Sequence, residues 1–558
     1  MSDNVRIVGL GGMDEEGKEC VVVEINSDIF VIDCGIREPD RTMPGVDYVI
    51  PRFDYLEENK DRVRAYFLLH GHDEATGAIV YLYDKVPAPI YCTAVTKAMI
   101  TNFAKHTGKD ISKFDWNIIP PTSSVIVAKR KIQFFHTAHN IADSCGVAIH
   151  TDKGNIVYTD DFVIENNATP SFLFDSRAVG KIAEEPTLLL MTESLYASRA
   201  GYTAPNYRLL PLLQQDFKAA TGRIFVSLFS NNLFNIGEIV NLAIECHKKI
   251  IPYDSLAQEI LDTMQSSGQV NIPPSCKASI DSLLRLKDDD IVVIMTAFGA
   301  KLFRRIALLA AGENEDKRVK INEKDTFFWC SPSDDNTELE YTDAIDELYR
   351  TGCQVININK KSFLKMHACQ EDIKTMISML RPKYYLPVRG LYKDLLANCM
   401  VALGMGVGLN HANVFLVENG MSVLIDDKGA RSFDEKIPHG DIMIDGEGVG
   451  DVSEQVLEDR QQLAEGVVIL AITVSESKRK IIAGPDIQMR GFVYAKDADI
   501  IQRDASKVFL ATVEEYLEKN IDLDLEELKQ SVYEKSLRTI RRQTGKEPMI
   551  VPLIIAVP

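Results

Sequence analysis

The chain has 558 residues, of which 46% are hydrophobic and 26% charged, and its formal net charge at neutral pH is −19. This length exceeds one ordinary core and indicates about two to four domains, while the composition is that of an ordinary globular protein. The acidic charge argues against indiscriminate binding to nucleic acid, although a basic groove can exist on an acidic protein.

Membrane and export signals are missing from the sequence pattern. No apolar run reaches the roughly 18 to 20 residues that a membrane span needs. The polar start Met1-Ser2-Asp3-Asn4 does not resemble a signal peptide. The ten cysteines are scattered without a Cys-x-x-Cys pair, and several, such as Cys34 and Cys92, lie in apolar contexts. We therefore expect a cytoplasmic protein with reduced, buried thiols and no membrane association.

The first predicted elements are strand-like runs at residues 20–25 and 29–34, which open an alternation of strands and helices up to about residue 200. This pattern predicts a layered α/β domain. Turn residues at 201–205 mark a boundary. A second alternation follows to Phe363, with strands of the parallel type at 223–228, 291–295 and 326–330. It predicts a second α/β domain, inserted into the first.

The remaining elements return to the first sheet and then form a small final domain. Short strands at 384–388 and 414–417 suit completion of the first sheet, and the Gly-rich run 445–450 predicts a linker. Strands at 467–474 and 549–556, with helices at 499–518 and 525–543, indicate an α+β domain. We divide the chain into residues 1–206, 207–363, 364–440, a linker 441–452, and 453–558.

The segment 70–75 carries the clearest chemical motif. His70 and His72 follow a buried strand, and histidines at i and i+2 of an extended segment point to one side and can share a metal ion. The motif resembles H-x-H-x-D-H of the metallo-β-lactamase hydrolases, but Glu74 and Ala75 stand where its last Asp and His hold a second metal. Glu74 still offers an oxygen, whereas Ala75 offers nothing. A pair of surface or core histidines explains an isolated H-x-H equally well.

Three more polar residues follow predicted strands, and their order supports the metal interpretation. Asp33, His139 and Asp161 each lie at or near a strand end. Alone, His139 is more often a hydrogen-bonded histidine, and Asp161 more often a helix or turn cap. Together with the two histidines of the motif, they predict a cluster of ligands.

At the level of longer segments, the chain resembles the ribonuclease J family of metallo-β-lactamase/β-CASP nucleases. It is most similar to the second, degenerate paralogue of Gram-positive bacteria. The matching segments run through the whole chain, at residues 10–12, 31–35, 69–72, 143–151, 381–388 and 484–494. The resemblance implies an αββα metallo-β-lactamase sandwich in residues 1–206 and 364–440, a β-CASP domain in 207–363, and an α+β assembly domain in 453–558.

The resemblance also assigns roles to single residues. It makes His70, His72, His139 and Asp161 the ligands of a first metal site, with Glu74 a further candidate, and it makes Asp161, Glu193 and His367 the catalytic residues of a weakened site. One Zn or Mn ion is expected at the first site. The second site is predicted to be lost, because Ala75 and Arg389 replace two of its histidines.

RNA and phosphate contacts are assigned to Arg389, Lys365, His367 and Ala368. The family's small, flexible phosphate loop here reads Lys365-Met366-His367-Ala368, which puts the phosphate pocket in doubt. Lys360 and Lys361 lie nearby, either beside a nucleic-acid channel or on a solvated loop. For Arg389 two hypotheses are open. Its guanidinium grips a phosphate, or it fills the vacant metal site through a salt bridge to Glu74 or Asp161.

Two functions follow from the resemblance. The first is a metal-dependent 5′-to-3′ exoribonuclease with endonuclease activity. The second, which we favour, is a largely non-catalytic subunit that binds RNA, an active ribonuclease J paralogue, or both, as a homodimer or a hetero-oligomer from dimer to tetramer. The losses at Ala75 and Arg389, on an intact scaffold, motivate this choice.

Overall fold

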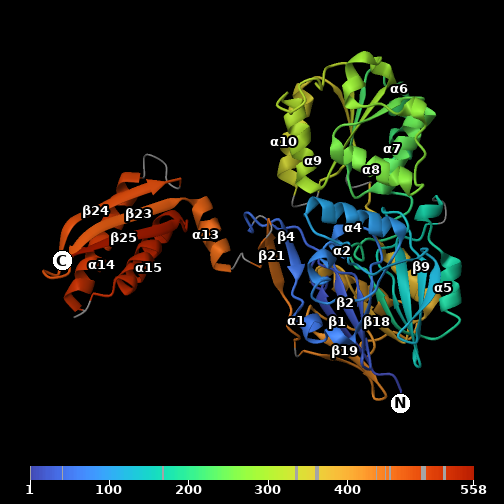
Figure 1. Cartoon of the computed structure of the whole chain (residues 1–558), viewed down its shortest axis with the longest axis horizontal. Coiled ribbons are helices and arrows are strands. Elements are labelled where there is room, and N and C mark those ends of the chain that lie inside the picture. The colour runs from blue at the N-terminus through green and yellow to red at the C-terminus, as the bar shows by residue number, and fades with distance from the viewer. Residues whose placement is uncertain are drawn as a thin grey trace. The chain divides into compact units, whose positions relative to one another are not determined.

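The computed structural model describes residues 2–40, 42–165, 169–333, 337–358, 363–434, 436–446, 448–450, 454–491, 498–519 and 523–558. The chain divides into two compact units, Met1–Glu38 with Val49–Ile442 and Pro39–Tyr48 with Met443–Pro558 (Figure 1). Lys360, Lys361, residues 447, 451 and 452 of the predicted linker and residues 492–494 of the C-terminal match lie outside the described residues. In the part of the chain that is described, no helix is both long and apolar enough to cross a membrane.

Two mixed sheets form the main body of the first unit. The eight-stranded sheet has the order β20-β19-β1-β2-β3-β5-β6-β7. Its strands are β1 (Val5–Gly11), β2 (Cys20–Ile25), β3 (Asp28–Ile32), β5 (Val63–Phe67), β6 (Ile90–Cys92), β7 (Trp116–Ile118), β19 (Ser422–Asp426) and β20 (Gly429–Phe433). The six-stranded sheet has the order β18-β12-β11-β10-β9-β8. Its strands are β8 (Ser123–Val127), β9 (Arg130–His136), β10 (Cys145–Thr151), β11 (Gly154–Tyr158), β12 (Thr187–Thr192) and β18 (Tyr384–Pro387).

The two sheets bury one apolar core between them. Phe30 and Phe67 of the first sheet and Phe134 of the second belong to this core, and the Phe67 and Phe134 rings meet edge to face at 5.6 Å. The opposite face of the second sheet packs on α5 (Ser176–Ile182), α11 (Gln370–Leu380) and α12 (Tyr392–Gly404). Between strands of the first sheet the chain forms β4 (Tyr48–Pro51), α1 (Asp54–Glu58), α2 (Asp73–Thr76), α3 (Ile79–Leu82) and α4 (Ala94–His106).

The inserted segment, green to yellow in Figure 1, forms a separate parallel sheet with the order β14-β15-β13-β16-β17. Its strands are β13 (Ile224–Phe229), β14 (Lys249–Pro252), β15 (Ile291–Ala297), β16 (Thr326–Trp329) and β17 (Gln354–Asn357). Helices α6 (Leu210–Ala219), α7 (Leu233–Glu245) and α8 (Ser255–Ser266) pack on one face. Helices α9 (Gly299–Ala310) and α10 (Glu338–Arg350) pack on the other, where the Phe303 and Trp329 rings stack at 5.5 Å.

The second unit contains a three-stranded sheet with the order β24-β23-β25 and two long helices. The strands are β23 (Val467–Ser475), β24 (Lys480–Arg490) and β25 (Met549–Val557), and the helices are α14 (Ala498–Lys519) and α15 (Leu525–Thr544). Phe509 and Leu528 of the helices share a core with Val468 of the sheet. Helix α13 (Glu454–Glu465) precedes the sheet. The predicted linker segment contains two short paired strands, β21 (Asp441–Asp445) and β22 (Gly448–Val449).

The predicted fold class, an αββα sandwich with an inserted α/β domain and a small C-terminal α+β domain, is confirmed. One predicted strand is wrong. Residues 414–417 form no strand, because only Val414 makes a bridge, to Tyr385, and the chain then leaves the sheet. Most strands that the sequence placed differ from the observed ones by one or two residues at an end, where hydrogen-bond pairing decides the boundary.

Parallel pairing brings several strand ends to one edge of the sandwich. In the first sheet Ile32 of β3 lies beside Phe67 of β5. In the second sheet Met191 of β12 lies between Tyr158 of β11 and Leu386 of β18. Since parallel strands end at the same edge, the segments that follow these five strands come together there.

Gly35, just after β3, packs closely against the backbone of α2, and a substitution at Gly35 tests this packing. A Cβ atom at Gly35 would lie 1.4 Å from the carbonyl oxygen of Glu74, in the backbone of α2. Because backbone cannot move aside as a flexible side chain can, we expect Gly35→Ala to lower the free energy of unfolding by about 1–3 kcal/mol or more. Gly180→Ala is the matched control, since a Cβ there meets nothing within 4 Å, and helix propensity predicts a gain of about 0.5–1 kcal/mol. Equal melting temperatures of the two variants would contradict the predicted steric clash.

Candidate metal centre

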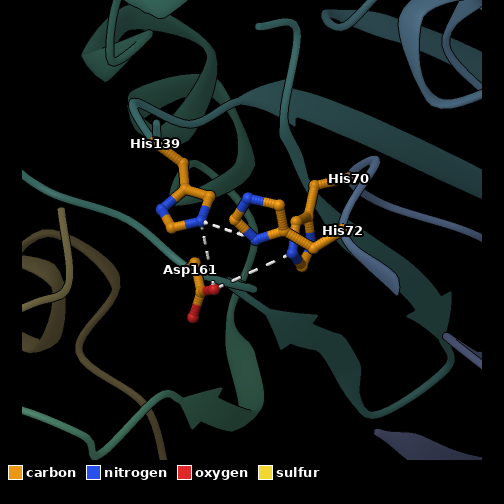
Figure 2. A group of neighbouring side chains, drawn as sticks. All are labelled: His70, His72, His139 and Asp161. Carbon is orange, nitrogen blue, oxygen red and sulfur yellow. Dashed lines mark hydrogen bonds and ion pairs between the residues drawn. The ribbon is translucent and has the colours of Figure 1, made fainter. Parts of the chain in front are cut away.

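Four of the predicted ligands lie together at the edge where the strands end (Figure 2). His70 and His72 lie between β5 and α2, His139 follows β9, and Asp161 follows β11. All four side chains are buried. His139 Nε2 lies 3.4 Å from Asp161 Oδ2 and 3.3 Å from His72 Nδ1, and His70 Nε2 lies 3.8 Å from the same Asp161 oxygen.

Each imidazole is oriented by an acceptor on its outer side. His70 Nδ1 lies 2.7 Å from Asp160 Oδ2, His72 Nε2 lies 3.1 Å from the carbonyl oxygen of Asn231, and His139 Nδ1 lies 2.7 Å from that of Met366. A carboxylate or carbonyl oxygen can only accept, so each of these ring nitrogens carries the proton and donates. The other nitrogen of each ring faces the cluster, where a neutral ring offers its lone pair as metal-ligating histidines do; His72 Nδ1 also lies 3.2 Å from Glu74 Oε1 and would have to give up any proton that it shares with that carboxylate.

These residues fit one divalent cation. Burial lowers the pKa of His139 well below its ordinary value, so this ring is neutral, as a ligand must be. Both carboxylate oxygens of Asp161 are buried, and Oδ2 faces the inner nitrogens of His139 and His70. Three imidazole nitrogens and a carboxylate are a donor set that suits Zn or Mn. Bound there, such an ion would supply Lewis acidity toward a phosphate oxygen.

Asp33 supports the loop that carries the two histidines of the motif. It follows β3 with a left-handed backbone (φ 60°), and its Oδ1 accepts a hydrogen bond of 3.0 Å from the backbone N–H of Leu69. Burial raises the pKa of Asp33 well above its ordinary value, and the neighbouring Asp160 carboxylate raises it further. Asp33 therefore lies near the cluster but directs one oxygen to the backbone.

A buried arginine lies against the cluster. Arg389 follows β18, and its side chain is 2% exposed. Its Nη2 lies 2.9 Å from Asp161 Oδ2 and 2.5 Å from Glu19 Oε1, while its Nη1 pairs with Asp160 Oδ1. Although burial lowers the pKa of Arg389, the carboxylates of Asp161, Glu19 and Asp160 raise it well above its ordinary value. One permanent cation thus contacts three carboxylates.

The backbone of Arg389 fixes this position. Its φ of 59° lies in the left-handed region, which is costly for a residue with a Cβ. Its N–H donates to the carbonyl of Gly12 at 2.9 Å, and its carbonyl accepts from the N–H of Ser194 at 3.0 Å. These two bonds hold the strained residue and direct its side chain to Asp161.

Of the two hypotheses for Arg389, the structure contains the ion pair with Asp161. Glu74 pairs instead with His72, whose Nδ1 lies 3.2 Å from its Oε1, so Glu74 lies at the rim of the metal cluster. Ala75 is fully buried and offers no ligand. The phosphate hypothesis stays a prediction, and the burial of the guanidinium disfavours it, because a phosphate would have to displace three carboxylates.

The predicted catalytic residues Asp161, Glu193 and His367 lie together. His367 Nδ1 lies 2.9 Å from Glu193 Oε2 and 3.4 Å from Asp161 Oδ1. Although burial lowers the pKa of His367, the Asp161 and Glu193 carboxylates raise it well above its ordinary value. Burial and the charge of Asp161 raise the pKa of Glu193 to about 7. Near neutral pH this pair is therefore able to hold or release a proton beside Asp161.

The other predicted phosphate-binding residues differ in what they can offer. Lys365 is exposed, and its ammonium group is without an ion-pair partner among the described residues. Ala368 departs from the prediction, because its side chain is buried and its N–H already donates to Glu193 Oε1 at 3.0 Å. That amide therefore positions Glu193, and no free donor is left at Ala368 for a phosphate.

Sequence reasoning missed two residues of the cluster, Glu19 and Asp160. Asp160 connects the histidine cluster with Arg389, since one of its carboxylate oxygens accepts a hydrogen bond from His70 and the other accepts one from Arg389. Its position beside Asp161 at a strand end was a usable signal. Glu19 precedes the buried strand β2 and is itself buried. Only its contact with Arg389, 370 positions later, gives it a role.

Known proteins resemble this chain along its whole length. The sequence model of the "Ribonuclease J, beta-CASP domain" matches residues 221–348, and that of the "Ribonuclease J C-terminal domain" matches residues 455–557. The chain is 33% identical to ribonuclease J2 of Bacillus subtilis (strain 168), over 100% of this chain and 99% of the relative. It is 31% identical to ribonuclease J 2 of Staphylococcus aureus (strain NCTC 8325 / PS 47), over 99% of this chain and 98% of the relative.

One solved structure shares the fold over much of the chain. A protein of unknown function from Enterococcus faecalis V583 aligns with a TM-score of 0.52 and 14% identity, covering 75% of this chain and 100% of that one. At this identity the likeness concerns the fold alone.

The pairing of Arg389 with Glu19 predicts a measurable coupling. Arg389→Met leaves buried carboxylates without their cation and should lower the free energy of unfolding by about 3–5 kcal/mol. Glu19→Gln in the same chain removes one of those charges, so the two losses should fall short of additivity by more than about 1 kcal/mol. Urea unfolding of the parent, both single variants and the double variant measures this. Arg177→Met, at an exposed position, is the control, and strictly additive losses would disprove the pair.

Proposed function

Because the chain belongs to the ribonuclease J family, we propose that it is a degenerate ribonuclease J-type subunit of the RNA processing and decay machinery. It binds RNA, an active ribonuclease J paralogue, or both, in the cytoplasm, and modulates that paralogue. Its own hydrolysis of RNA is weak or lost. The relatives reported above carry the name of the family's second paralogue, which supports this assignment.

The observation that carries the proposal is the ion pair between Arg389 and Asp161. Arg389 Nη2 lies 2.9 Å from Asp161 Oδ2, the oxygen that also faces His139 and His70. In a two-metal site this carboxylate would bridge the ions. A guanidinium in that place repels a second cation, and Ala75 supplies no ligand for one. Two-metal phosphodiester hydrolysis stabilises both the attacking and the leaving oxygen, so a single ion performs only part of it.

Two features support a binding role. The exposed Lys365 lies two residues before His367, whose side chain is only partly buried. The second unit has its own core and matches the family's C-terminal domain over residues 455–557. We propose that this unit contributes to a homodimer or a hetero-oligomer, from dimer to tetramer.

A metal-dependent 5′-to-3′ exoribonuclease with endonuclease activity, acting in mRNA decay and rRNA maturation, is the alternative. The intact cluster of His70, His72, His139 and Asp161 favours it, as does the proton-holding pair of Glu193 and His367. These groups suffice for slow turnover if one ion and the arginine together neutralise the phosphate.

The two proposals differ in a degradation assay. The protein is incubated with 5′-monophosphorylated single-stranded RNA and Mn²⁺, beside a variant that carries His70→Ala and His72→Ala. We expect equal inactivity, with one Mn²⁺ bound by the parent and none by the variant, as measured by metal analysis after gel filtration. Degradation by the parent alone would establish the exoribonuclease alternative. Two equivalents of Mn²⁺ per parent chain would show that Arg389 does not exclude the second ion.

Association with an active paralogue is tested by size. The protein, an active ribonuclease J and their mixture are each passed over a sizing column with light-scattering detection. We expect the mixture to form a species that contains both chains, and the RNA-cleavage rate or pattern of the active chain to change. An unrelated acidic protein of similar mass is the control. Monomers alone in every sample would contradict the subunit role.

A further inference from the structure

A stacked pair of side chains extends the metal cluster toward solvent. The Tyr196 ring meets the His367 ring edge to face, with centroids 5.6 Å apart. On the Tyr196 ring lies the guanidinium of Arg199, whose Cζ is 4.2 Å from the ring centroid. His367 in turn lies 5.3 Å from His139, centroid to centroid. A continuous series of planar groups therefore leads from a metal ligand to an exposed arginine.

This stack is held in place by the backbone around it. The N–H of Ala197 donates to Ser194 and that of Arg199 donates to Tyr196, each at 2.9 Å. The carbonyl of Arg199 accepts from Gln370, at the start of α11, at 3.0 Å. Ala197 is fully buried beneath the turn. The loop after Glu193 thus presents Tyr196 and Arg199 on a rigid base.

The charge of Arg199 is not neutralised by any of the described residues. Arg199 is exposed, and its guanidinium has no carboxylate or carbonyl partner among the residues that the structure describes. Lys365, two residues before His367, is exposed and likewise unpaired in the described part of the chain. Arg199 lies on the tyrosine that contacts His367, and Lys365 lies two residues before His367, so two exposed cations flank this histidine's surroundings on a chain of net charge −19. They offer an anionic ligand a local attraction that the whole surface does not.

We propose that Tyr196 and Arg199 form a nucleobase-stacking site for single-stranded RNA beside the metal cluster. This inference rests on the proposed RNA-binding function and names the contact that serves it. Tyr196 lies against the guanidinium of the exposed Arg199, and in the proposed site a base packs on the solvent side of that group. The N–H groups at the edge of the guanidinium remain free to donate to the base or its phosphate. Because every base has a π-face, the site tolerates any sequence.

A base on Arg199 is separated from His367 only by the guanidinium and the Tyr196 ring. RNA is thereby retained at the cluster whether or not the phosphodiester is cut. Such retention suits a subunit that binds RNA on behalf of a partner.

Binding of two ligands tests the proposal. Each carries a 3′ label and a 5′-monophosphate. One is oligoadenylate, and the other is an abasic ribose-phosphate chain of the same length. Fluorescence anisotropy is recorded in EDTA, so that cleavage plays no part. The parent should bind oligoadenylate more tightly than the abasic chain, and Arg199→Ala or Tyr196→Leu should weaken oligoadenylate binding about tenfold, which removes most of that preference.

Two control variants separate stacking from charge and from folding. Arg199→Lys keeps the charge without the plane, so it should retain the affinity for the abasic chain and lose the preference for bases. Arg177→Ala removes one exposed charge from α5 and should keep the preference unchanged. Melting temperatures equal to that of the parent show that each variant is folded.

Failure of the stacking site and failure of the proposed RNA-binding function give different results in this assay. Equal binding of both ligands by the parent overturns the stacking site while leaving RNA binding intact. So does an equal loss for both ligands in Arg199→Ala, which would assign a purely ionic role to Arg199. If the parent binds neither ligand, the proposed RNA-binding function itself is overturned.

Discussion

The buried negative charge of Asp161 must be neutralised, and the rest of the site is arranged to do so. Its carboxylate is fully buried, so its charge must be balanced by neighbouring cations. Arg389 and His139 approach Oδ2, and His367 approaches Oδ1. Although burial raises its pKa, the charges of Arg389 and His367 hold the pKa of Asp161 well below its ordinary value. The carboxylate is therefore ionised at neutral pH and fixed between two groups of partners.

The fold brings these charged side chains together because they follow neighbouring parallel strands that end at one edge of the sheet. Asp160 and Asp161 follow β11, Glu193 follows β12 and Arg389 follows β18, and these three strands are neighbours in one sheet. Three acidic side chains from two adjacent ends would repel one another in a buried place. The end of β18 supplies the cation, Arg389. The left-handed backbone of Arg389 costs about 1–3 kcal/mol of strain, and the ion pairs that this conformation makes possible offset that cost.

Much of the fold was predictable from the sequence, because runs of apolar residues indicate buried strands. The histidines of residues 70–72 were also visible, since both ligands lie in one short segment. The environment of Arg389 was not. It depends on Glu19, which is distant in sequence, and on the register that places β18 beside β12. The wrongly predicted strand at 414–417 also reflects strand pairing that the sequence pattern does not reveal. Its apolar residues pack on the core, but they do not pair with another strand along their length.

A guanidinium replaces only part of what a metal ion provides. It neutralises carboxylates and donates directed hydrogen bonds, but it has no empty orbital to accept a lone pair, so it cannot polarise a phosphate as a Lewis acid. It is also covalently tied to the chain, so the charge balance at Asp161 persists whether or not metal is available. Arg389 therefore balances the charges of Asp160 and Asp161 without supplying Lewis acidity.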